Sequence, residues 1–567
     1  MKFPIWRSYM SVARKVWVLS AAVLTASLAM AADSSTPQPA ANSRQQAVIN
    51  SIFYQEAKLV ENMHKYTPLV ETYIQNMKPD DELGEVPTSD KYFLGRLVLD
   101  KRGINDLSYD KKKAGMFSRV LDRLDSFYKM TYLPEGFMQL VFLSHGFTAQ
   151  NYDLKYLRQE FLGDVRTLVF DVVPHKKIKG THFVGRIWVE DQQHNIVRMN
   201  GTYEPQRSGN FYFHFDSWRM NMQPGLWLPA LVYTEDSDVK YDLIRKISMK
   251  GQTRLWGYDL KHSGRQTEFT DLQVEENGQE VSDKSGSSAN EMSPIESRHK
   301  WQREAEDNVL DRMERAGVLA PPGEVTKVLE TVVNNLEITN NLNIQPEVRC
   351  RVLLTTPLES FTVGNTIVMS RGLLDVLPDE ASLAMMLSHE LAHISLGHSV
   401  NTKYAFSDRM IFPDEQVMQK IGMRRNDSDE DAADKKAVEL LKSSPYRDKL
   451  SNAGLFLKAL QSRSHELTWL ISPNFGNRMA KGSDILRMEP LIQSAPELKT
   501  SDVRQLAALP LGSRIKLDPW DDHVNLKRSK PETVLSAREK LPFEVTPMIP
   551  NLMRAGEARG NEVAEKR

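Results

Sequence analysis

The chain of 567 residues contains one cysteine, Cys350. A single cysteine cannot form an internal disulfide, so a disulfide-stabilised scaffold is excluded. Cys350 lies in residues 348–354, an alternating run that predicts a strand. In such a strand a buried apolar residue is favoured over a reactive thiol.

The chain also lacks an excess of charge and long apolar runs. It has 73 basic and 74 acidic residues, a net charge of −1, which gives no electrostatic basis for a nucleic-acid partner. Beyond the N-terminal region no stretch approaches about 18 uninterrupted apolar residues, which excludes a mature chain with several membrane spans. With 41% hydrophobic and 26% charged residues, the composition is that of a globular protein, and the length predicts two or three domains.

The N-terminal region has the pattern of a secretory signal peptide. The apolar run 16–30 follows four basic residues and ends at Ala29-Met30-Ala31, an A-x-A cleavage site. We therefore predict a signal peptide over residues 1–31, with an uncleaved N-terminal anchor as the alternative. No cysteine follows the apolar run, which excludes a lipoprotein anchor. An exported chain of this size without disulfides fits a bacterial periplasm.

Residues 32–92 are predicted to form a spacer and a helical arm. Apolar residues at helical spacing extend from Arg44 to Met77, and Pro68 is expected to kink or split the helix. Residues 93–272 begin with helical patterns at 114–128 and 136–142. Short alternating runs between turn residues follow, and they predict an antiparallel, β-rich accessory domain.

Residues 185–201, which read GRIWVED and then NIVRMNG, resemble a hairpin of the bacterial lipoprotein carriers. The resemblance implies a curved half-barrel sheet that holds acyl chains, and thus a lipid-binding carrier as one rival function. The alternative is that these aromatic residues fill an ordinary sheet core.

A metal-binding pattern stands in a helix-favouring apolar run at His389-Glu390-Leu391-Ala392-His393. Residues i and i+4 share one face of a helix, so both imidazoles can bind one metal ion. Glu390 points to the edge of that face, within reach of a metal-bound water. Zn²⁺ favours such nitrogen ligands and keeps one position for water in catalytic sites, so H-E-x-x-H indicates metal-assisted hydrolysis.

Two histidines leave the zinc site incomplete. A third histidine in the pattern H-E-x-x-H-x-x-G-x-x-H is excluded because Leu396 and Ser399 occupy the required positions. His398 is out of register by one residue, which favours a solvated or supporting role. The helix that opens near Asn426 offers Glu430 as third ligand and Asp434, on the same face, as acceptor from a ligand histidine. The alternative is an acidic first turn stabilised by the helix dipole.

These motifs, together with Met369-Ser370-Arg371-Gly372-Leu373-Leu374 before them, resemble the gluzincin family of the CAAX prenyl proteases, the HtpX-like heat-shock proteases and the periplasmic β-barrel-assembly-enhancing protease. The resemblance runs from about Arg303 to Lys481. It implies a zinc endopeptidase with one Zn²⁺ per chain, held by His389, His393 and Glu430, with Glu390 as general base.

The resemblance implies two further sets of site residues. The family carries a His-Pro pair and then an arginine after the third ligand, and here Ser472-Pro473 precedes Arg478, with His465 as a substitute for the missing histidine. The family also binds its substrate along an edge strand beside the metal helix. That strand corresponds to Phe361, Thr362, Val363 and Gly364, in a segment that begins Glu359-Ser360-Phe361 instead of Asn-Ala-Phe.

The predicted fold class is α+β multidomain. The β-rich accessory domain precedes a linker at 273–296, a mostly helical zincin-type catalytic domain with a small β-sheet at 297–485, and a C-terminal extension at 486–567. We expect helices at 303–316 and 323–335, and strands at 348–354, 359–370 and 511–517. The predicted function is that of an exported zinc metalloendopeptidase acting on proteins or peptides, with envelope or membrane-associated partners. A metal-bound assembly factor of the envelope with weak or no proteolysis is the alternative.

Overall fold

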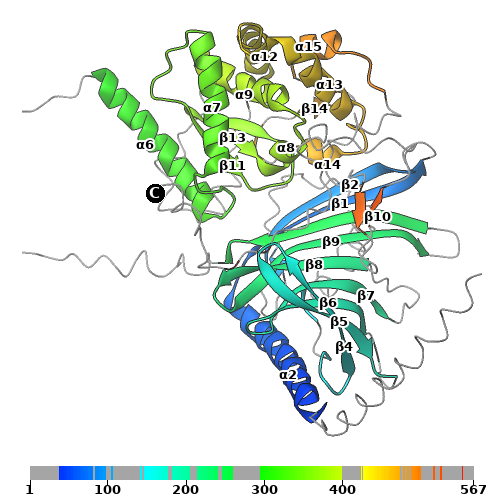
Figure 1. Cartoon of the computed structure of the whole chain (residues 1–567). Coiled ribbons are helices and arrows are strands. Elements are labelled where there is room, and N and C mark those ends of the chain that lie inside the picture. Colours follow the sequence, from blue (N-terminus) through cyan, green and yellow to red (C-terminus); the bar gives the residue numbers. More distant parts are fainter. Residues whose placement is uncertain are drawn as a thin grey trace, which may run out of the picture. The chain divides into compact units, whose positions relative to one another are not determined.

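The computed structural model describes the following residues: 38–80, 84–97, 104–105, 141–143, 146–176, 180, 182–204, 214–240, 246–258, 294–398, 423, 425–472, 475–476, 479–481, 484–485, 487–499, 515–517, 524–526, 552 and 554 (Figure 1). The chain divides into two compact units, residues 1–52 and 53–567, and the features below lie in the second unless stated. In the described ranges no helix has the length and hydrophobicity to span a membrane.

A ten-stranded antiparallel sheet forms the β-rich part of the chain (Figure 1). Its order is β3-β2-β1-β10-β9-β8-β7-β6-β5-β4, so the first hairpin joins the last strand of a meander. The strands are β1 (Leu69–Asp80), β2 (Gly84–Leu97), β3 (Ile104–Asn105), β4 (Tyr152–Leu162), β5 (Val165–Pro174), β6 (His182–Glu190), β7 (Ile196–Glu204), β8 (His214–Gln223), β9 (Leu226–Lys240) and β10 (Lys246–Trp256). The expected antiparallel sheet is confirmed, and β6 and β7 form the expected hairpin.

The prediction that the helical arm continues to Met77 is wrong. Helix α2 (Gln38–Asn62), which crosses from the first unit into the second, ends at Asn62, and Leu69 to Asp80 form strand β1. Leu69, Tyr73 and Met77 have helical spacing, but they belong to a strand that is buried on both faces. Such a strand has no polar alternation to reveal it. The helical patterns at 114–128 and at 136–140 lie outside the described residues.

A buried ion pair joins α2 to the sheet. Glu56 and Arg219, each 2% exposed, form two bonds of 2.7 and 2.8 Å. Leu143 N also donates to Glu56, so every oxygen of this buried carboxylate has a partner.

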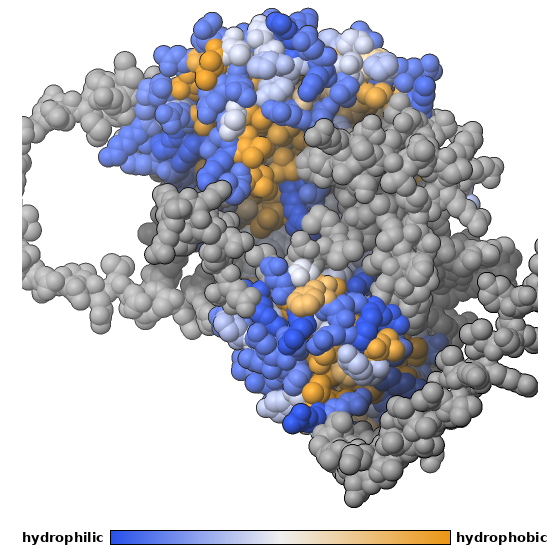
Figure 2. Space-filling view, viewed as in Figure 1, coloured by the Kyte–Doolittle hydropathy of each residue, from blue (hydrophilic) through white to orange (hydrophobic). Residues whose placement is uncertain are grey.

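The helical region surrounds a small sheet with the order β11-β13-β12, made of β11 (Arg349–Leu353), β12 (Ser360–Val363) and β13 (Thr366–Ser370). The single strand expected at 359–370 is thus a hairpin, which turns at Gly364 with φ of 57°. Cys350 on β11 is buried, as expected, and burial raises the pKa of its thiol. The coloured part of the face in Figure 2 is mostly hydrophilic, with apolar residues gathered in patches.

The helices are α6 (Pro294–Arg315), α7 (Glu324–Thr339), α8 (Arg371–Val376), α9 (Glu380–Ser395), α12 (Asp427–Lys442), α13 (Leu450–Gln461), α14 (Thr468–Ile471) and α15 (Glu489–Ser494). The helices expected at 303–316 and 323–335 are confirmed as parts of α6 and α7. Two short hairpins follow, β14 (Ala480–Lys481) with β15 (Asp484–Ile485) and β16 (Ile515–Leu517) with β17 (Val524–Leu526). Only β16 of the strand expected at 511–517 is described. The large sheet before a helical region confirms the α+β layout.

Two buried carboxylates of the large sheet contact the helical region. Glu71 on β1 accepts a 2.6 Å hydrogen bond from Thr356 N, in the loop before β12. Asp90 on β2 accepts from Trp469 N at 2.9 Å and from Leu470 N at 2.8 Å, in the first turn of α14. The sheet therefore contacts both the loop before β12 and helix α14.

Candidate metal centre

Helix α9 begins where its sequence predicts. Asp379 caps it by accepting a 2.8 Å hydrogen bond from Ser382 N, and Glu380 stands in the first turn. From Ala384 to His393 every residue is buried, so both histidines lie in the interior of the fold. The helix ends at Ser395, shortly before Gly397, whose φ of 69° only glycine adopts freely.

Helix α12 crosses α9 closely because its contact face is thin. Asn426 caps α12 by accepting from Asp429 N at 2.8 Å. Ala433 and Ala437 are fully buried and leave room for the neighbouring helix. Glu430, one turn into α12, thereby reaches the two histidines.

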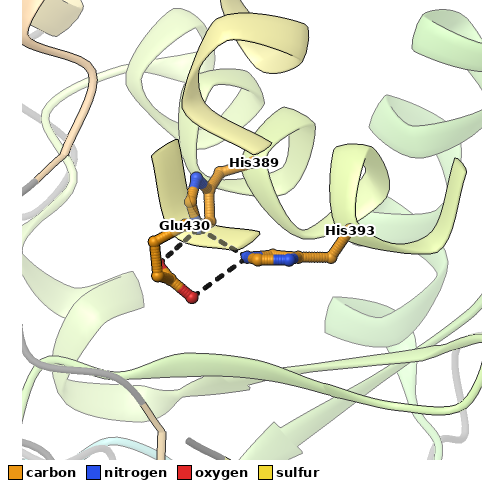
Figure 3. A group of neighbouring side chains, drawn as sticks. All are labelled: His389, His393 and Glu430. Atoms are coloured by element: carbon orange, nitrogen blue, oxygen red, sulfur yellow. Dashed lines mark hydrogen bonds and ion pairs between the residues drawn. The ribbon is translucent and has the colours of Figure 1, made fainter. Parts of the chain in front are cut away.

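His389, His393 and Glu430 converge on one point (Figure 3). The two Nε2 atoms lie 3.1 Å apart, and the Glu430 oxygens lie 3.3 Å from His389 Nε2 and 3.2 Å from His393 Nε2. Donors bound tetrahedrally to zinc at about 2.0–2.1 Å stand about 3.3 Å from each other. The donor set and its spacing thus fit a zinc ion, and the three residues form a candidate metal site.

Two further side chains stand behind the histidines. Asp434 Oδ1 lies 2.8 Å from His389 Nδ1, the position that the sequence analysis assigned to Asp434. His398 Nδ1 lies 2.9 Å from His393 Nδ1, so His398 contacts a ligand candidate without entering the donor cluster. Such contacts fix which ring nitrogen of a histidine is free for a metal.

His393 is held in the neutral form. Its pKa is lowered to about 3 because burial disfavours the imidazolium, an effect opposed by Glu390 and reinforced by His389, Arg425 and Arg487. A neutral imidazole is the form that binds metal ions.

Glu390 is 2% exposed, and its Oε1 accepts a 2.7 Å hydrogen bond from Ser360 Oγ. Burial raises the pKa of this carboxyl, but His389, His393, Arg487 and the Ser360 hydroxyl outweigh burial and hold it below the ordinary value. Glu390 is therefore ionised at neutral pH.

Arg487, which the sequence analysis missed, enters the donor cluster. It is 3% exposed, its Nη1 lies 2.6 Å from His389 Nε2, and its guanidinium contacts Glu430. Burial lowers the pKa of Arg487 to about 10, so it stays cationic at neutral pH. One signal could have revealed it: an arginine within the otherwise apolar run 485–488.

The sequence analysis proposed three other residues for the arginine-and-histidine motif after the third ligand, and the structure describes two of them. Arg478 lies outside the described residues. Ser472 is exposed after α14, and His465 is exposed in the turn after α13. Arg487 is thus a described arginine that contacts the donors His389 and Glu430 directly.

Strand β12 is an edge strand beside α9, since β13 is its one strand neighbour in the small sheet. Phe361, Thr362 and Val363 are buried on it. Phe361 packs against Phe475, and the Thr362 hydroxyl contacts Arg425. Gly364 forms the turn after β12, where a side chain would collide with Glu306. The turn therefore requires glycine at position 364.

The family model "Peptidase family M48" matches residues 324–450, from α7 to the start of α13. The match supports a metallopeptidase of family M48 in this region. No curated protein matches the chain. A solved domain of an outer membrane lipoprotein-sorting protein from Vibrio parahaemolyticus is 8% identical, and the alignment covers 37% of this chain and 92% of that one. Its TM-score of 0.18 is too low to support any inference.

Proposed function

We propose that the chain is an exported, zinc-dependent metalloendopeptidase that cleaves proteins or peptides in the bacterial periplasm. The observation that carries the proposal is the cluster of two imidazole nitrogens and one carboxylate at the spacing of a tetrahedral zinc site, with an ionised glutamate beside it. The M48 match over the same residues supports a peptidase rather than another zinc hydrolase.

His389, His393 and Glu430 would hold the ion. Zinc bound there would polarise the scissile carbonyl and lower the pKa of a water molecule to about 7. Asp434 keeps the His389 ring oriented. Within the described structure the site is buried, and this dry environment strengthens every charge interaction in it.

Glu390 supplies the proton transfers. As an ionised carboxylate it takes the proton of the attacking water and returns it to the leaving amine. The Ser360 hydroxyl occupies Oε1 and leaves Oε2 for the water. Ser360 replaces the alanine of the related family's Asn-Ala-Phe segment, so this restraint is a feature of the present chain.

Arg487 stabilises the charge that develops on the carbonyl oxygen. Its guanidinium contacts His389 and Glu430, so it stands beside the atoms that would hold the metal. A fixed cation at the reacting centre lowers the energy of an oxyanion more than that of the neutral carbonyl. We assign to Arg487 the role that the sequence analysis gave to Arg478.

The substrate would lie along the outer edge of β12 as an added strand. β12 starts at Ser360, whose side chain touches Glu390, so a peptide paired with β12 passes the catalytic carboxylate. Strand addition uses main-chain hydrogen bonds, and it suits extended or unfolded protein segments. Misassembled envelope proteins are the substrate class that we propose.

The test compares Glu390→Gln and Glu430→Ala with the wild type, with zinc measured by mass spectrometry and cleavage measured on casein. We expect Glu390→Gln to keep about one zinc per chain and to lose cleavage by at least about a thousandfold, because it lacks the base. Glu430→Ala should lose most of the zinc. Asp431→Ala, an exposed acidic residue on the same turn, is the matched control and should change neither.

Casein cleavage that survives in Glu390→Gln would contradict the peptidase mechanism. An envelope phenotype that persists in that variant would instead favour the metal-bound assembly factor. Export is tested separately: N-terminal sequencing of the periplasmic protein should begin at Ala32, and an intact Met1 would overturn the signal peptide.

A further inference from the structure

Two described residues near the end of the sequence, Leu552 and Arg554, contact the large sheet at the β4–β5 and β6–β7 turns. Leu552 forms a parallel bridge with Gly163, in the turn between β4 and β5, and its carbonyl accepts a 3.0 Å hydrogen bond from Asp164 N. More than three hundred residues separate these partners in the sequence. The contact is therefore a tertiary docking event.

The Leu552 side chain fills an apolar site on the sheet. It is 4% exposed, in a cluster with the buried residues Leu162, Val165, Val169, Trp188, Val197, Trp218 and Trp227. All of these come from strands β4 to β9 or their turns, so the sheet alone builds the wall of the site. The tail contributes one leucine to it.

Two carboxylates stand beside this apolar site and hold Arg554. Its Nη2 lies 2.9 Å from Asp191 Oδ1, and its Nη1 lies 3.3 Å from Glu190 Oε2. Glu190 is 1% exposed, and three backbone N–H groups together with the Asn195 amide fix it. These hydrogen bonds outweigh burial and lower the pKa of Glu190. Glu190 is therefore a buried carboxylate that can bind a cationic side chain.

We propose that the end of the sheet around the β4–β5 and β6–β7 turns is a binding site for a peptide segment with leucine and, two residues later, arginine. Leu552 and Arg554 of this chain occupy the site as a tethered ligand. An alternation of two fits an extended peptide, whose residues i and i+2 point the same way. The site thereby holds Leu552 and Arg554 on the sheet.

A tethered ligand excludes free peptides through its high effective concentration, although the contact itself is small. Release of the tail should therefore expose the site. The release variant is the full chain with Leu552→Asp and Arg554→Glu, which leaves every residue of the sheet unchanged. The probe is a fluorescein-labelled peptide of residues 547–557, and binding is measured by fluorescence anisotropy.

We expect the release variant to bind the peptide at least tenfold more tightly than the wild-type chain, whose site is filled. Peptides that carry Leu552→Asp or Arg554→Glu should lose this binding at least tenfold. Asp191→Arg in the release variant should reject the natural peptide and accept one with Arg554→Asp, a reversal that a merely destabilised sheet would not give.

Three results would overturn the proposal. The first is a release variant that is folded by circular dichroism but does not bind the peptide. The second is a wild-type chain that binds the peptide as tightly as the release variant, which would show that the tail does not occupy the site. The third is equal binding of the altered and the natural peptides, which would show that neither side chain is recognised.

Discussion

Asp434 on α12 lies 2.8 Å from Nδ1 of His389 on α9. Its other oxygen accepts a 2.8 Å hydrogen bond from Met488 N, the residue after Arg487. One carboxylate thus orients a candidate zinc ligand and anchors the segment that brings the arginine to the site. Helix α9, helix α12 and the segment after β15 therefore meet at Asp434.

Asp434→Asn should weaken zinc binding without abolishing it. The amide holds the ring less firmly and lacks the charge that makes His389 a stronger donor, so we expect the zinc affinity to fall about 10- to 100-fold. Competition with a chromophoric chelator measures the affinity. Asp431→Asn, an exposed change on the same helix, is the control. Equal zinc affinities of the two variants would show that Asp434 does not support the metal site.

Arg487→Ala should reduce kcat/KM on a peptide substrate about 100- to 1,000-fold while zinc stays bound, since a cation that stabilises the oxyanion is lost. Arg487→Lys keeps the charge and should recover part of the loss. Arg478→Ala is the decisive comparison, because the sequence pattern favours that arginine, whereas Arg487 contacts the donors in the described structure. A larger loss in Arg478→Ala would reverse the assignment.

Ser360→Ala removes the hydroxyl that holds Glu390 Oε1. A freer carboxylate is in the productive position for less of the time, so we expect kcat to fall about tenfold with KM nearly unchanged. The matched control is Ser388→Ala, which removes a buried hydroxyl that lies on α9 and bonds the Met385 carbonyl. It should have little effect. If KM rises and kcat does not fall, Ser360 contacts the substrate instead.

The sequence predicted the donor cluster because its chemistry is local. The i, i+4 spacing on α9 determines where two imidazoles point, and the same spacing relates Glu430 to Asp434. The paired alanines indicated close helix contact, and Ala433 and Ala437 are fully buried. Capping and periodicity also predicted where α9 begins.

Arg487 and β1 escaped prediction because their surroundings are not local. Arg487 lies almost a hundred residues from His389, and the short segment around it carries no period. β1 pairs with β2 and with β10, whose paired residues lie more than 170 positions further along the chain. Because β1 is buried on both faces, the spacing of its apolar residues does not follow a single buried face. Only the fold supplies these neighbours.

The last prediction concerns Asp90, whose pKa is raised from 3.8 to about 6 by burial, although Trp469 N, Leu470 N and the hydroxyls of Tyr73 and Thr468 favour the charged form. Between about pH 4 and 6 the folded chain then binds more protons than the unfolded chain, so the contribution of Asp90 to stability falls as pH rises. Asp90→Asn lacks this dependence. Its free energy of unfolding relative to the wild type should increase from pH 4 to 7, by at most about 3 kcal/mol. Urea denaturation of both chains at each pH measures the difference. Parallel pH curves would show that Asp90 titrates normally and that its contact with α14 does not depend on pH.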